Sequence, residues 1–113
     1  MSCPVLPEQH VREILQKTRE TGNEHVFGVC ADGSVTDPVE GQKTKAETDS
    51  TINQCDLDNG PVHLVHTHPN GVKRLSDKDR EAAAHEDIAS VCVAVSDGIV
   101  CESVDRCEPE VEE

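Results

Sequence analysis

The sequence is poor in aromatic side chains: it contains one Phe and neither Trp nor Tyr, and 35% of its residues are hydrophobic. A core must therefore be built from Val, Ile, Leu and Ala. Over 113 residues such a core suffices for one domain, since two cores would each be too small to be stable. We expect a single domain over residues 1–107 and, from the acidic segment EPEVEE, a flexible tail over 108–113.

Long apolar segments are also missing. No run approaches the roughly 20 apolar residues that a membrane-spanning helix needs. The first residues, MSCPVLPEQH, lack the basic and apolar blocks of a signal peptide. These two absences predict a cytoplasmic protein that does not contact a membrane.

Positive charge is scarce, because 10 Lys and Arg residues face 23 Asp and Glu residues and give a formal net charge of −13. Such a chain repels nucleic-acid backbones and anionic membranes, so we expect no direct binding to nucleic acid. The composition is also typical of a halophilic archaeon or other halophilic prokaryote, where molar salt shortens the screening length to about 3 Å.

No two cysteines have the CxxC spacing of a zinc ribbon. A disulfide scaffold would require a secretory context and closer spacing, and neither is present. We therefore expect mostly reduced thiols, several of which serve as small apolar residues in strands. The six cysteines are Cys3, Cys30, Cys55, Cys92, Cys101 and Cys107.

Hydrophobic periodicity predicts an α/β fold with a mixed central sheet flanked by helices. Residues 8–20 form an amphipathic helix with one apolar stripe, and Gly22 ends it. We expect strands over residues 24–31 and within residues 35–51. An interior strand is expected over residues 61–69, and a second helix over residues 76–89. Residues 90–104 form two strands that join at Asp97-Gly98. The helical stripe consists of Val11, Ile14, Leu15 and Thr18.

The segment HTHPNGVKRLSDKD, residues 66–79, carries the clearest chemical signal. Side chains two apart on a strand share a face, with Cα atoms about 6.6 Å apart, so His66 and His68 can converge on one ion. Asp79 can supply a third ligand after the turn at Pro69-Asn70-Gly71. Three protein ligands and one open position are the usual arrangement of catalytic zinc.

A structural interpretation competes with the metal site. Ser76-x-x-Asp79 resembles a capping box, and an aspartate in the first turn of a helix is favourable without a metal. Two histidines on the strand of an acidic protein could also be idle. The combination of the HxHP pattern at residues 66–69 with Ser76-x-x-Asp79 at a fixed spacing favours the metal site.

Residues 66–79 resemble the HxHPx6SxxD signature of the JAMM (JAB/MPN) metalloprotease superfamily, which includes RadC-type domains. The resemblance extends over roughly residues 8–104 and implies the cytidine-deaminase-like JAB/MPN architecture. The positions that match the signature are His66, His68, Pro69, Ser76 and Asp79.

The resemblance assigns a role to each of these polar residues. His66, His68 and Asp79 would bind Zn²⁺, and Ser76 would donate a hydrogen bond to the oxyanion that forms when a carbonyl is attacked. Bound zinc would polarise the carbonyl and lower the pKa of a water toward roughly 7. A carboxylate is still needed to move the proton.

The family places this carboxylate at the start of the first strand after the first helix, which is where Glu24 lies. Many members have the glutamate three residues before a glycine. Here Glu24 lies four residues before Gly28, and His25 lies three residues before it. A one-residue shift moves a side chain to the other face of a sheet unless it lies at a strand edge or bulge. RadC-like domains have a similar Glu-His start, which favours Glu24 over the alternatives Glu20 and His25.

The resemblance thus implies a zinc metallopeptidase or isopeptidase that hydrolyses an amide bond and releases ubiquitin-like modifiers from lysines. Its partners would be modifier conjugates or a peptide substrate, and a homodimer is possible. One alternative is a non-catalytic MPN-type interaction module. Another is a RadC-like protein linked to DNA metabolism, against which the acidity argues.

A few residues around the signature have weaker indications. His63 is expected on the face opposite His66, and Thr67 and Asn70 are expected to line the cleft. Lys73 and Arg74 form a small basic island that could meet an acidic part of a substrate, although exposure to solvent explains them more simply.

Overall fold

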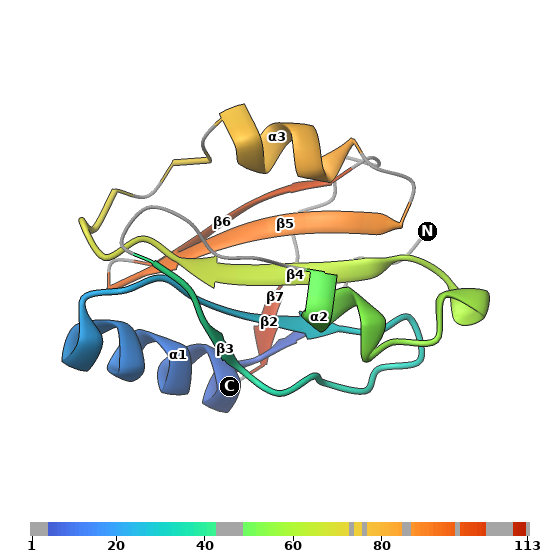
Figure 1. The fold of residues 1–113 in the computed structure, drawn as a ribbon, viewed down its shortest axis with the longest axis horizontal. Coiled ribbons are helices and arrows are strands. Elements are labelled where there is room, and N and C mark those ends of the chain that lie inside the picture. The colour runs from blue at the N-terminus through green and yellow to red at the C-terminus, as the bar shows by residue number, and fades with distance from the viewer. Residues whose placement is uncertain are drawn as a thin grey trace.

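A five-stranded mixed sheet forms the centre of the structure, a computed structural model that describes residues 5–42, 49–72, 74–75, 77–84, 87–96, 98–103 and 110–112. The strand order is β3-β2-β4-β5-β6, in which β4 and β5 are parallel and the other pairs are antiparallel (Figure 1). The expected α/β class with a mixed central sheet is confirmed. The strands are β2 (His25–Val29), β3 (Val39–Glu40), β4 (Val62–Thr67), β5 (Ile88–Val95) and β6 (Gly98–Ser103).

One face of the sheet is covered by α1 (Glu8–Thr21). Val11 and Ile14 of the predicted stripe pack against Phe27 of β2 and Val65 of β4. Gly22 adopts the left-handed conformation, with φ of 74°, and its N–H bonds to the Thr18 carbonyl, so the helix ends where the glycine predicts.

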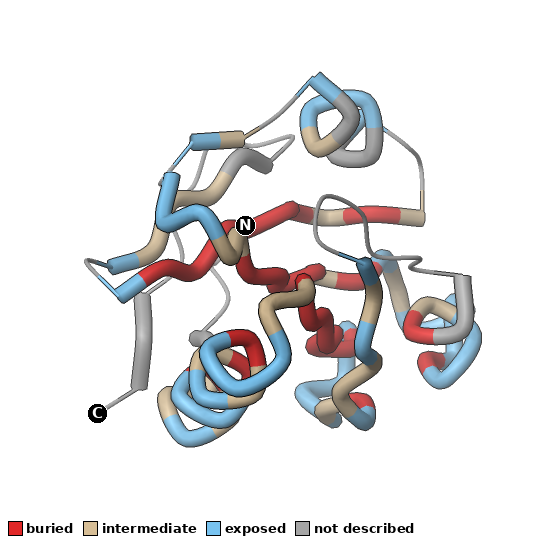
Figure 2. The backbone as a smooth tube through the Cα atoms, turned by 60° about the vertical axis from the view of Figure 1, so that its left-hand side comes forward, coloured by how far each residue is buried: buried red, intermediate tan, exposed pale blue. Residues whose placement is uncertain are grey.

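The opposite face carries α2 (Asp49–Asn53) and α3 (Asp77–Ala83), with a second apolar cluster beneath them (Figure 1). Leu75, just before α3, packs against this cluster. Figure 2 shows that the buried residues gather in the strands between the helices. The cluster consists of Val26, Cys30, Cys55, Val62, Leu64, Ile88 and Val91.

The expectation of reduced thiols is wrong for four cysteines. Cys30, at the end of β2, is bonded to Cys55 after α2, and Cys92 of β5 is bonded to Cys101 of β6. Cys92 and Cys101 stand directly opposite each other in the β5–β6 ladder, and this register cannot be read from their sequence spacing. Cys3 and Cys107 lie outside the described residues.

Several element bounds also differ from the expectation. The predicted helix over 76–89 extends too far, because α3 ends at Ala83 and Ile88 is buried in β5. The helix α2 and a short 3₁₀ turn at Leu57–Asn59 were not predicted. The tail expected to be flexible is described only over Glu110–Glu112, which form β7.

Two further features concern the chain ends and the membrane. β7 pairs in parallel with β1 (Val5–Pro7), and this pair forms a separate two-stranded sheet.

Among the helices in the described part of the chain, none combines the length and hydrophobicity that a bilayer crossing requires.

Candidate metal centre

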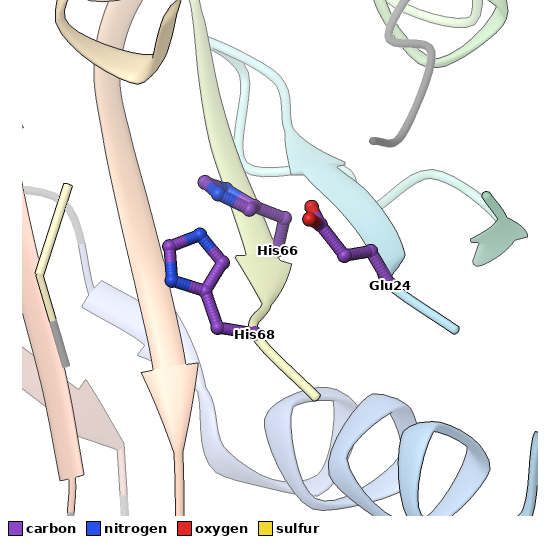
Figure 3. A group of neighbouring side chains, drawn as sticks. All are labelled: Glu24, His66 and His68. Atoms are coloured by element: carbon purple, nitrogen blue, oxygen red, sulfur yellow. The ribbon is translucent and has the colours of Figure 1, made fainter. Parts of the chain in front are cut away.

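Two antiparallel strands bring three side chains of the candidate site together. His66 lies in β4, His68 directly follows β4, and Glu24 directly precedes β2. Val26 is the register partner of His66, so Glu24 is placed beside His68 on the same face of the sheet. The ligand atoms of Glu24, His66 and His68 all lie within 4.8 Å of one another (Figure 3), and this group could hold a metal ion.

The position of Glu24 at the strand start answers the question raised by its spacing from Gly28. Glu24 is 6% exposed and joins the two imidazoles, whereas His25 is 3% exposed and contacts Thr18 of α1 on the opposite face. Glu20 is exposed on α1, where it accepts a hydrogen bond from Gln16. Of the three candidates for the base, Glu24 is therefore the one that the fold places at the site.

Asp79 reaches the same two imidazoles from the first turn of α3. Its Oδ1 lies 3.1 Å from Nε2 of His66, and its Oδ2 lies 3.5 Å from Nε2 of His68. The expected ligands His66, His68 and Asp79 are thus adjacent in space. Ser76, the expected oxyanion donor, lies outside the described residues.

The imidazole nitrogens have the environments that metal ligands need. Nδ1 of His68 lies 3.0 Å from the carbonyl oxygen of Val72; since a carbonyl only accepts, Nδ1 donates there, and Nε2, 3.5 Å from Oδ2 of Asp79, is the nitrogen that would bind a metal once it is deprotonated. Nε2 of His66 is buried and makes no hydrogen bond to any described residue, although Oδ1 of Asp79 is only 3.1 Å away. A close contact without hydrogen-bond geometry suits two groups that share a cation.

Burial and neighbouring charges change the proton affinities of the site. Burial raises the pKa of Glu24, the two imidazoles oppose this rise, and Asp79 adds to it. The hydrogen bond to Asp79 raises the pKa of His68, and burial opposes that rise. Glu24 is therefore a better proton acceptor than an exposed glutamate.

A buried polar network lies directly behind the site, on the α1 face. The N–H of His25 donates to Oγ1 of Thr67, at 2.9 Å, and Oγ1 of Thr18 is hydrogen-bonded to both Thr67 and Nδ1 of His25. Thr67 stands between the two histidines of the site, and His25 follows Glu24. The network therefore ties the start of β2 to the end of β4 and so limits movement of Glu24 relative to the imidazoles.

The network corrects one expectation and supports another. Thr67 was expected to line the cleft, but it is fully buried and faces α1, because it alternates with His66 and His68 along the chain. His63 lies on the face opposite His66, as expected, where its Nδ1 is 2.9 Å from Oγ of Ser90. Thr18 was predicted only as part of the helical stripe, and its polar role was missed.

A cavity of about 440 Å³ adjoins the site at His68. It lies beside the loop that connects β4 to α3, and Asn70 lines it as expected. The remaining lining residues are Val72, Arg74, Leu75, Asp77 and Arg80.

Comparison of the chain with models of known protein families finds no match, and no curated protein matches it either. The resemblance to the JAMM signature therefore stays a prediction, carried by the residues of the signature and by Glu24.

Proposed function

We propose that the chain is a zinc-dependent metallopeptidase or isopeptidase that hydrolyses an amide bond. The observation that supports this most directly is the convergence of two imidazoles, His66 and His68, with two carboxylates, Glu24 and Asp79, on one face of the sheet. In this proposal the mixed sheet with α1 on one face and α3 on the other is a small version of the JAB/MPN architecture.

The donor set fits zinc. Two imidazole nitrogens and a carboxylate oxygen are common ligands of catalytic zinc, and the buried Nε2 of His66 otherwise lacks a hydrogen bond within the described residues. His66, His68 and Asp79 would hold the ion. When bound, zinc would polarise the scissile carbonyl and lower the pKa of a water toward roughly 7.

Glu24 moves the proton in the proposed reaction. It accepts a proton from the attacking water, whose oxygen forms a bond to the carbonyl carbon. When the C–N bond breaks, Glu24 returns this proton to the departing nitrogen, so that amide and water give an acid and an amine. Burial supports this role, because a carboxylate with a raised pKa holds the transferred proton more readily.

The substrate class and the oxyanion donor come from the resemblance. Ser76 would donate a hydrogen bond to the carbonyl oxygen as negative charge develops on it. The substrate would be a ubiquitin-like modifier joined through its C-terminal Gly-Gly to the side chain of a lysine.

The test separates metal binding from hydrolysis. Purified protein should contain one zinc per chain, and His68→Ala should lose it. Glu24→Ala should keep zinc but lose cleavage of a ubiquitin-like modifier linked through Gly-Gly to a labelled lysine peptide. Absence of zinc from the purified protein, or unchanged cleavage by Glu24→Ala, would refute the proposal.

The proximity of Glu24 to both histidines favours one alternative, a non-catalytic interaction module with a bound metal. In this case Glu24 would itself be a ligand and no base would remain. Glu24→Ala would then weaken zinc binding rather than preserve it, so zinc titration of this variant distinguishes the two functions.

A further inference from the structure

The cavity beside His68 differs in charge from the rest of the chain. Arg74, from the loop before α3, and Arg80, from α3 itself, both line it. They are two of only 10 Lys and Arg residues in a chain with a net charge of −13. Asp77 is the acidic residue of the lining, so two positive charges face one negative charge there.

An apolar contact surface accompanies the two arginines. Val72 is 48% exposed and lines the cavity, and Leu75 lies beside it, partly buried. Val72 is one of two large hydrophobic residues that are exposed in the described part of the chain, the other being Leu57. Val72 also supplies the carbonyl that holds Nδ1 of His68, so the cavity and the candidate metal centre share a wall.

We propose that this cavity binds an acidic side chain of the polypeptide substrate, with an apolar neighbour of that residue against Val72. Arginine suits this role because its guanidinium forms directed, charge-assisted hydrogen bonds to a carboxylate. The acidic remainder of the chain repels such a residue, so an acidic substrate segment is drawn to this cavity and placed beside His68. The identity of the reaction rests on the proposed function, but the binding preference does not.

Arg74 and Arg80 lie on two consecutive segments, and each segment contacts the candidate metal centre through a different residue. Arg74 is carried by the loop whose Val72 is bonded to His68, and Arg80 by the helix whose Asp79 contacts both imidazoles. An acidic residue held between them is therefore fixed relative to the two elements that build the site. The subsite thus links substrate recognition to the position of the reacting amide bond.

The test measures binding and needs neither metal nor turnover. The ¹⁵N-labelled, metal-free full-length chain is titrated with the peptide acetyl-Gly-Ser-Glu-Leu-Ser-Gly-amide and with matched peptides that carry Gln or Lys in place of Glu. The Glu peptide should bind about three-fold more tightly than the Gln peptide, as expected for an exposed ion pair. The Arg74 and Arg80 side-chain NMR signals should shift.

Arg74→Gln and Arg80→Gln should remove the preference for Glu, because each loses a guanidinium. Arg19→Gln is the matched control: it changes the net charge equally, but Arg19 is exposed in the last turn of α1 on the other side of the sheet. Equal binding of the Glu and Gln peptides, a preference for Lys, or an equal loss in Arg19→Gln would overturn the subsite. A protein that prefers Glu but never binds zinc would retain the subsite and refute only the proposed hydrolase.

Discussion

The two faces of the sheet are built from the same strands but have different tasks. On the α1 face, Phe27 and Val65 form the apolar core, and His25 and Thr67 form a buried hydrogen-bonded network. On the α3 face, Glu24 and the histidines of HTH converge at the candidate metal centre. Because side chains alternate along a strand, Glu24 and His66 are each followed in sequence by a residue of this network, His25 and Thr67, which holds the strand from the other face.

The largest expected difference between the faces concerns metal binding. His66→Ala should reduce zinc affinity by more than the roughly 10- to 100-fold that outer-shell partners typically cost, because it removes a ligand. His63→Ala, three residues away but on the other face, should bind zinc as the unchanged protein does. Isothermal titration with zinc measures both. Equal losses in the two variants would show that the faces are not separate in function.

A smaller effect is expected from the network behind the site. Thr67→Val leaves the N–H of His25 without its acceptor, a loss of about 1–3 kcal/mol in the free energy of unfolding. Zinc affinity should be nearly unchanged, since His66 and His68 remain. Turnover should fall by about 10-fold or more, because small displacements of a catalytic group are costly.

Thr67→Ser is the matched control for this prediction, since it keeps the hydroxyl group. It should restore turnover and the slow amide hydrogen exchange of His25, which Thr67→Val should accelerate. If Thr67→Val is as active as the unchanged protein, the network has only a structural role.

The smallest expected effect is a pH dependence on the α1 face. Burial lowers the pKa of His63 from its ordinary value of 6.5. As the pH falls through 6.5, the unfolded chain binds a proton that the folded chain does not, so the free energy of unfolding decreases. The slope for one such proton cannot exceed about 1.4 kcal/mol per pH unit.

Urea unfolding of the metal-free protein between about pH 5 and pH 7.5 measures this dependence. His63→Gln should lose less stability than the unchanged protein over that range, and the difference isolates His63 from the other histidines. Parallel pH profiles would contradict the assignment.

The sequence was sufficient to predict those parts of the site that depend on local geometry. The period of a strand places His66 and His68 on one face, and the turn after them with a helix start brings Asp79 back. Residue spacing alone could not decide whether Glu24 lies at the site, because the orientation of its side chain depends on where β2 begins and on how β2 pairs with β4. The apolar stripe and Gly22 likewise determined α1 almost to the residue.

Features that depend on contacts between distant segments could not be predicted. The bond between Thr18 and Thr67 joins residues 49 positions apart, and only the packing of α1 on the sheet brings them together. The disulfides depend on strand register in one case and on the path of the loop around α2 in the other. Ile88 was assigned to a helix because the strand that buries it is defined by pairing with β4.

The two disulfides lie on opposite faces of the sheet. Cys30–Cys55 closes a loop of 25 residues and anchors the segment with α2, whereas Cys92–Cys101 closes 9 residues within a hairpin. A covalent link that encloses more chain removes more conformational freedom from the unfolded ensemble, so the first should contribute about 1 kcal/mol more than the second. A reductant that opened both bonds would therefore loosen the segment that contains α2 more than it loosens the β5–β6 hairpin.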